Sequence, residues 1–186
     1  MKKITTFLLF LISFSAFSQI LNPVKWEFGS EKISETEYDL IFVAKIDHHW
    51  ALYSQFVEEG GPLPTVFSFE SASDFKLIET VKELESNKVT QLDPVFEMVV
   101  SKYYDKAIFK QRISVKSSEF NIKGNIDFMT CDDTKCTYLP DNPFTFNYSS
   151  EAGFLIVGGT PVSNLEVSEN AEQNLYGMSI DSVSKA

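Results

Sequence analysis

The alternation of apolar and polar residues along the middle of this chain constrains its fold more than any other feature. From Phe120 to Phe128 every second residue is apolar or glycine, and every residue between them is polar. The side chains of a β-strand point to opposite faces in turn, so this segment is expected to bury one face and expose the other. No stretch keeps the three- and four-residue spacing of an amphipathic helix for long, and the pattern therefore predicts an all-β chain.

Turn-forming residues divide this pattern into short strands. The strands predicted in this way are Tyr38–Ile46, Trp50–Phe56, Thr65–Phe69, Phe75–Ile78, Met98–Tyr103, Ala107–Val115, Phe120–Thr130 and Phe144–Tyr148. Short strands joined by polar turns, with 14% aromatic residues to fill a core, predict an immunoglobulin-like two-sheet β-sandwich. A closed barrel is the alternative architecture.

Both ends of the chain are expected to lie outside this domain. The chain starts with Met1-Lys2-Lys3 and continues into an apolar run that is too short to span a membrane, followed by small residues. This order predicts a secretory signal peptide over residues 1–18 and an exported protein that is soluble once the signal is cleaved. Residues 19–150 are predicted to form the domain. Residues 151–186, which become rich in polar residues from Thr160, are predicted to form a flexible tail or linker.

The charge and the sparse metal ligands narrow the range of partners. Loss of Lys2 and Lys3 with the signal peptide deepens the formal net charge from −10 to −12. A surface of this sign repels nucleic acid, so no nucleic-acid partner is expected, and the charge serves solubility or the steering of a basic partner. Zinc needs four ligands, and the histidines, His48 and His49, are expected in a turn far from the cysteines. The sequence predicts no metal and, without any nucleotide, flavin or haem fingerprint, no cofactor.

The two cysteines of the chain, Cys131 and Cys136, flank four turn-forming residues at the end of the clearest strand. Their thiols are expected to face each other across a hairpin, where paired positions supply the Cα separation of about 4.4–6.8 Å that a disulfide needs. So short a loop gives a stabilisation on the order of 2 kcal/mol, which is small for a domain of this size. From the residues alone, a stabilising disulfide and a redox pair remain equally open.

Three segments resemble a known family. They are Phe128–Cys136, Trp50–Gln55 and Asp93–Phe96, and they are similar to segments of the N-terminal periplasmic domain of the thiol:disulfide interchange protein DsbD. In that family the domain is immunoglobulin-like, and its cysteine pair receives electrons from other domains of the same protein and reduces oxidised periplasmic partners. The resemblance implies that Cys131 and Cys136 are the catalytic redox pair.

The resemblance also implies a set of supporting residues around the pair. The loop that begins at Asp93 would cap the disulfide, and Phe96 would shield the sulfurs, with Val95 as the alternative shield. Asp93 would accept or donate a proton, and Trp50 and Tyr53 would lie beside the pair, although aromatic residues on strands more often belong to a core. A cap of this kind slows the access of nonspecific oxidants to a dithiol.

The chain also departs from the family pattern at three places. Glu97 stands where the family has a small residue, and Thr137–Pro140 contains one proline where the family has consecutive prolines. The chain given ends at Ala186, before the membrane domain and the thioredoxin-like domain of DsbD. It is therefore expected to be either a stand-alone relative or a fragment of a longer protein.

The function predicted from these features is thiol–disulfide exchange of the protein-disulfide reductase type, with a thioredoxin-like domain or a membrane reductase as electron donor. Oxidised periplasmic thiol-disulfide proteins are the expected partners. We expect Cys136 to engage partners, with Lys135 favouring its thiolate, and Cys131 to resolve, while the reverse assignment stays open. Asp132 and Asp133 are expected to raise the thiol pKa values by like-charge repulsion. The alternative function is a noncatalytic immunoglobulin-like binding domain with a structural disulfide.

Overall fold

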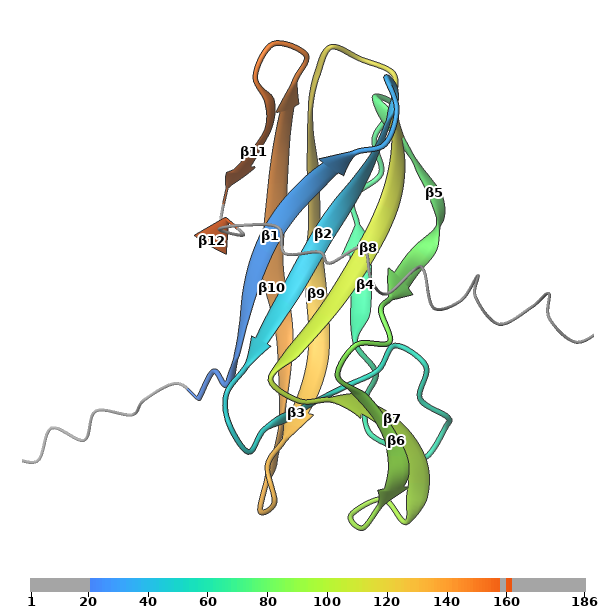
Figure 1. The fold of residues 1–186 in the computed structure, drawn as a ribbon, viewed down its shortest axis with the longest axis vertical. Helices are drawn as coiled ribbons and strands as arrows, with labels where there is room; N and C mark the ends of the chain where they lie inside the picture. The colour runs from blue at the N-terminus through green and yellow to red at the C-terminus, as the bar shows by residue number, and fades with distance from the viewer. Residues whose placement is uncertain (1–20, 158–159, 162–186) are drawn as a thin grey trace, which may run out of the picture.

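The computed structural model describes residues 21–157 and 160–161, which form two β-sheets packed face to face (Figure 1). No helix among these residues is long and apolar enough to cross a membrane. The arrangement confirms the predicted all-β, immunoglobulin-like sandwich, and the two separate sheets exclude the closed barrel. The predicted signal peptide and residues 162–186 of the predicted tail lie outside the described residues.

The first sheet has the strand order β12-β1-β2-β8-β5, and all its pairs are antiparallel except β1 with β12. Its strands are β1 (Val24–Lys32), β2 (Glu37–Ile46), β5 (Phe75–Glu83), β8 (Lys106–Val115) and β12 (Thr160–Pro161). The second sheet has the order β11-β10-β9-β3-β7-β6, and β4 also pairs with β9. Its strands are β3 (Ala51–Tyr53), β4 (Val66–Phe69), β6 (Lys88–Asp93), β7 (Met98–Tyr103), β9 (Glu119–Cys131), β10 (Cys136–Ser149) and β11 (Gly153–Val157).

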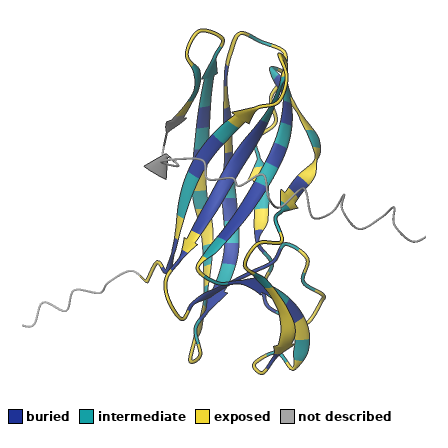
Figure 2. Ribbon diagram, in the orientation of Figure 1, coloured by how far each residue is buried: buried dark blue, intermediate teal, exposed yellow. Residues whose placement is uncertain are grey.

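The buried residues lie mainly on the strands of the two sheets (Figure 2), and the core between the sheets is rich in aromatic residues. The predicted alternation of β9 is confirmed, because Phe120, Ile122, Ile126 and Phe128 are all buried. Gly124 continues this inward row, and a Cβ added there would clash with the Ser68 carbonyl oxygen. A residue without a side chain therefore allows β4 to approach β9 closely.

The sequence missed four strands, β1, β6, β11 and β12, and misplaced several ends. β1 and β6 were not predicted, and β6 has a mostly exposed, polar surface that does not alternate clearly. β11 pairs with β10 along Thr145–Ser149, so the second sheet continues past residue 150, where the predicted domain ends. β3 is also shorter than predicted. The residues just after β3 bond to a side chain and not to a neighbouring strand, because the buried carboxylate of Glu83 accepts hydrogen bonds from Ser54 Oγ (2.6 Å) and Gln55 N (2.9 Å).

Two hairpins project from the same end of the sandwich and position the candidate site (Figure 1). One joins β9 to β10 and carries both cysteines, and the other joins β6 to β7 through residues 94–97. β3 lies between β9 and β7 in the second sheet and connects the two hairpins. Segments distant in the sequence are thereby brought to one end of the fold.

Candidate functional site

The cysteine hairpin is closed by a disulfide between the last residue of β9 and the first residue of β10. Cys131 and Cys136 are directly paired across the two strands, with a Cα–Cα separation of 4.1 Å. The expectation that the two thiols face each other across a hairpin is confirmed. The two side chains lie on the outer face of the second sheet, since the inward row of β9 is Phe120 to Phe128.

The turn between the cysteines is held by the side chain of Asp132. Its Oδ1 accepts hydrogen bonds from Thr134 N (2.8 Å), Thr134 Oγ1 (2.8 Å) and Lys135 N (2.9 Å). The Asp132 amide donates to the Lys135 carbonyl at 3.0 Å. The hydrogen bonds from Thr134 and Lys135 lower the pKa of the Asp132 carboxyl, which therefore remains ionised at neutral pH. The turn geometry is thus supplied by an aspartate of the kind that favours such turns.

The two cysteines differ in their exposure to solvent. Cys131 is 6% exposed and belongs to a small apolar cluster with Tyr53 and Val100, on the outer face of the second sheet. Cys136 is exposed, because β10 forms the border of the sheet at this end. A partner approaching from solvent therefore meets Cys136 first.

The turn of the second hairpin, residues 94–97, is built around Asp93, which is 2% exposed. Its Oδ1 accepts hydrogen bonds from the amides of Val95 (2.9 Å) and Phe96 (3.4 Å), and its backbone carbonyl accepts one from Glu97 N (2.9 Å). Glu97 has a φ of 54°, in the left-handed region that favours glycine. Glycine adopts this conformation without strain, which is a physical reason why the family described above has a small residue where this chain has Glu97.

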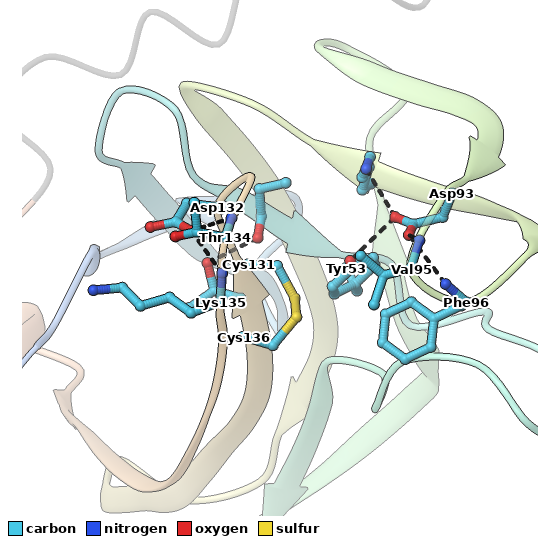
Figure 3. Close-up of a disulfide and its surroundings, with 12 residues drawn as sticks. Tyr53, Asp93, Val95, Phe96, Cys131, Asp132, Thr134, Lys135 and Cys136 are labelled. Atoms are coloured by element: carbon cyan, nitrogen blue, oxygen red, sulfur yellow. Dashed lines mark hydrogen bonds and ion pairs between the residues drawn. A yellow bond between two sulfur atoms is a disulfide. The ribbon is translucent and has the colours of Figure 1, made fainter.

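A buried ion pair ties this turn to β7 and β3. Lys102 Nζ lies 2.9 Å from Asp93 Oδ2, and the Tyr53 hydroxyl donates to the same oxygen at 3.3 Å (Figure 3). Burial alone would raise the pKa of Asp93, but hydrogen bonds from Lys102 and two backbone amides outweigh it and lower the pKa. Burial alone would lower the pKa of Lys102, but the hydrogen bond to Asp93 outweighs burial, and the pKa is raised. Both groups are therefore charged at neutral pH.

The same turn determines which residue faces the cysteine cluster. The Phe96 ring packs against the cluster that contains Cys131, with its centroid 6.0 Å from that of Tyr53. Val95 is 66% exposed. Of the two predicted shields, Phe96 packs into the apolar cluster that contains Cys131, whereas Val95 is largely exposed beside it (Figure 3).

A cleft of about 110 Å³ separates the two hairpins. Its walls include Cys131 and Asp132 from one hairpin, Asp93 and Val95 from the other, and Lys102 between them. The disulfide is thus approached from two sides, through this cleft at Cys131 and from open solvent at Cys136.

Trp50 takes the core position that the sequence left open as the alternative, and the expected position of Lys135 is corrected. Trp50 belongs to the main core between the sheets, whereas Tyr53, three residues later, lies on the opposite face beside Cys131. Lys135 extends away from the disulfide (Figure 3), and its Nζ lies 5.6 Å from the centroid of the Trp50 ring. Its ammonium group is therefore directed at an aromatic face, where a cation is stabilised, and away from the sulfurs.

The sequence reasoning missed Lys102, which makes the central contact with Asp93. The available signal was a lysine on the same face as Met98 and Val100 in a strand that is otherwise mostly apolar, where a charge requires a partner. His48 and His49 lie in a turn, as predicted, and His49 has a φ of 69°. Among residues 21–157 and 160–161, no group of three His, Cys, Asp or Glu side chains is arranged to hold a metal ion.

The sequence matches no family model and no curated protein. Several solved structures are similar to the chain. The N-terminal periplasmic domain of ScsB from Proteus mirabilis is 15% identical with a TM-score of 0.46, over 68% of this chain and 46% of that one, so the chain spans less than half of its length. The reduced N-terminal domain of DsbD from Neisseria meningitidis is 12% identical with a TM-score of 0.42, over 75% of this chain and 92% of that one. The major pilin SpaD from Corynebacterium diphtheriae is 12% identical with a TM-score of 0.35, over 71% of this chain and 39% of that one. The second of these is a domain of the family that the cysteine segment resembles.

Proposed function

We propose that this chain is a periplasmic thiol–disulfide exchange module, in which Cys131 and Cys136 alternate between a disulfide and a dithiol and pass electrons to oxidised partner proteins. The observation that carries the proposal is the asymmetric exposure of the pair. The exposed Cys136 is open to a partner sulfur, and Cys131 lies buried beside it. Exposed disulfides are the labile and catalytic ones, whereas structural disulfides resist reduction.

In the reaction, the thiolate of reduced Cys136 attacks one sulfur of a partner disulfide. A mixed disulfide forms, and the other partner sulfur leaves as a thiolate and takes up a proton. The thiolate of Cys131 then attacks the Cys136 sulfur, which restores the Cys131–Cys136 disulfide and releases the partner as a dithiol. Two electrons have moved to the partner. A thioredoxin-like dithiol domain or a membrane reductase supplies the electrons for the next cycle by the reverse exchange.

The second hairpin acts in this proposal as a cap on the buried sulfur. Asp93 holds Val95 and Phe96 through their backbone amides, and Lys102 holds Asp93. Phe96 thereby stays against the cluster that contains Cys131. Because a sulfur reacts only when an attacking group reaches it, this contact limits exchange at Cys131 and leaves Cys136 as the point of entry.

The experiment that tests the proposal is a redox titration of the mature chain in glutathione buffers, with the thiols counted by alkylation and mass spectrometry. A midpoint potential between about −180 and −270 mV is expected, in the range of exchange catalysts. A potential below about −300 mV would mark a structural disulfide and would favour a noncatalytic binding domain.

A further inference from the structure

Beside Cys136, one border of β10 is not paired with another strand of the described chain, and this border has no role in the exchange reaction described above. β10 pairs with β9 along most of its length, but β11 covers only Thr145–Ser149 on its other side. Figure 1 shows β11 at the end of β10 that lies away from the cysteine hairpin. Among the described residues, no strand lies against β10 between Cys136 and Phe144.

The hydrogen-bond pattern shows which backbone groups face outward along this border. Residues that face each other in an antiparallel pair alternate between close pairs without mutual hydrogen bonds, about 4.5 Å apart, and bonded pairs about 5.5 Å apart. Cys131 and Cys136 are 4.1 Å apart at Cα, and the neighbouring bond joins Asp132 N to the Lys135 carbonyl. The cysteines are therefore a non-bonded pair, and the N–H and C=O of Cys136 point away from β9. Tyr138, two residues on, presents its N–H and C=O in the same direction.

Farther along, the border of β10 is closed to an additional strand. The register with β9 shifts between Leu139 and Asn142, and Asp141 has a φ of 56°. Pro140 and Pro143 have no N–H to donate. Prolines and bulges are the devices by which sheet borders avoid pairing with other chains. Only the four residues from Cys136 to Leu139, next to the disulfide, keep a regular open border.

We propose that this open border, Cys136–Leu139, binds the partner as an added β-strand, and that the reacting cysteine of the partner lies within that strand. The inference rests on the exchange function proposed above and names its substrate class, namely proteins whose reactive cysteine lies in an extended segment. Added strands gain affinity from main-chain hydrogen bonds and specificity from alternate side chains. Tyr138, which is 45% exposed and lies on the same face as Cys136, contacts the residue of the added strand next in that row.

The spacing of such a complex suits the covalent step. The partner residue opposite Cys136 forms a bonded pair with it, with Cα atoms about 5.5 Å apart and both side chains on one face. That separation lies within the range of about 4.4–6.8 Å found for disulfides. When this residue is a cysteine in a disulfide, the Cys136 thiolate bonds to its sulfur, and the second partner sulfur leaves as a thiolate and is protonated. The Cys131 thiolate then displaces the strand cysteine as a thiol.

The test measures how fast two capped peptides, each with one central cysteine between threonine and valine residues, open the disulfide of the oxidised mature chain, read by alkylation of the freed thiols. The second peptide is methylated at the cysteine nitrogen, which removes the strand hydrogen bond and leaves the side chains unchanged. Glutathione serves as a thiol that cannot form a strand. The unmethylated peptide is expected to react about tenfold faster than the methylated one, the factor that about 1.4 kcal/mol of hydrogen bonding produces. Equal rates for the two peptides would overturn the inference.

Two variants of Tyr138 distinguish the contribution of its backbone N–H from the contribution of its ring. Tyr138→Pro removes the outward N–H without removing a bond to β9, as proline at a sheet border can, whereas Tyr138→Ala keeps the N–H and removes the ring. The rate with the unmethylated peptide, divided by the rate with glutathione in the same chain, is expected to fall in Tyr138→Pro and to persist in Tyr138→Ala. An equal fall in both variants would assign the effect to the ring and overturn the inference. If glutathione and dithiothreitol fail to open the disulfide in every chain, the exchange function itself fails. If they open it and no peptide preference appears, only the strand inference fails.

Discussion

Lys102 Nζ lies 2.9 Å from Asp93 Oδ2, and the two side chains of this ion pair are 10% and 2% exposed. Removing one member of a buried pair leaves an uncompensated charge. Lys102→Met is therefore predicted to lower the free energy of unfolding by about 3 kcal/mol, measured by urea denaturation. Lys25→Met, at an exposed lysine on β1, is the control and is expected to change it by less than about 0.5 kcal/mol. Equal midpoints for the two variants would show that the pair does not stabilise the hairpin.

The pKa of Asp93 predicts a specific pH dependence of stability. Burial raises this pKa, but the hydrogen bonds from Lys102, Val95 and Phe96 lower it below the ordinary carboxyl value. A carboxyl of this kind stabilises the fold above its unfolded-state pKa, about 3.9, and the stabilisation is lost as the pH falls through the lower folded-state pKa. The difference in unfolding free energy between the natural chain and Asp93→Asn should be constant from pH 7 to about 5 and should shrink below about 3.9. A difference that persists unchanged to pH 2 would contradict this assignment.

Glu97 adopts a left-handed backbone conformation, with a φ of 54°. Glu97→Gly is predicted to raise the free energy of unfolding by about 0.5 kcal/mol, because the relief of steric strain exceeds the entropy that glycine adds to the unfolded chain. Glu97→Ala, which removes the carboxylate but keeps Cβ, separates strain from charge and should not share the gain. Thermal unfolding of the three chains measures the effect, and an equal gain for both variants would attribute it to charge.

Phe96 contacts the cluster around Cys131, and Val95 beside it is 66% exposed. Phe96→Ala is predicted to speed reduction of the disulfide by dithiothreitol about tenfold, equivalent to about 1.4 kcal/mol in the activation barrier. Val95→Ala, which trims the wall of the cleft without removing a ring from the cluster, is the matched control and should change the rate much less. Quenched alkylation over time gives both rates, and equal rates in the two variants would remove Phe96 from the role of shield.

The unequal exposure of the cysteines predicts which single variant is trapped by a disulfide reagent. Cys131→Ser leaves the exposed Cys136 and should form a stable mixed disulfide with oxidised glutathione. Cys136→Ser leaves Cys131, which is 6% exposed, and should react far more slowly. Mass spectrometry of both adducts measures the difference. Faster reaction of the Cys136→Ser chain would reverse the roles of the two cysteines.

The sequence predicts well those features that depend on one strand at a time. The alternation along β9 correctly identifies the inward row from Phe120 to Phe128, and the spacing of the cysteines correctly places them across a hairpin. The sequence also indicates, by their separation of three residues on an extended segment, that Trp50 and Tyr53 face opposite sides of the sheet. The prediction that placed both beside the cysteines did not use this spacing. β6 was missed because its largely exposed residues lack an apolar period, and it is ordered by pairing with β7.

The features that escaped prediction depend on how separate strands meet. The contact between Asp93 and Lys102 depends on the register of β6 on β7, which sequence spacing does not reveal. The choice of Phe96 over Val95 as the inward residue depends on the hydrogen bonds of a single turn. Lys135 was expected to favour a thiolate from its position beside Cys136, but the turn directs its side chain to Trp50.

The hydrogen bonds that hold the turn at Asp132 involve no atom of either cysteine side chain. Opening the disulfide therefore removes none of them, and the two thiols stay neighbours in the reduced chain. A second thiol held this close acts as a reagent at very high effective concentration. A mixed disulfide at Cys136 is consequently short-lived, and its lifetime is set by the geometry of a four-residue turn instead of by the supply of external thiol.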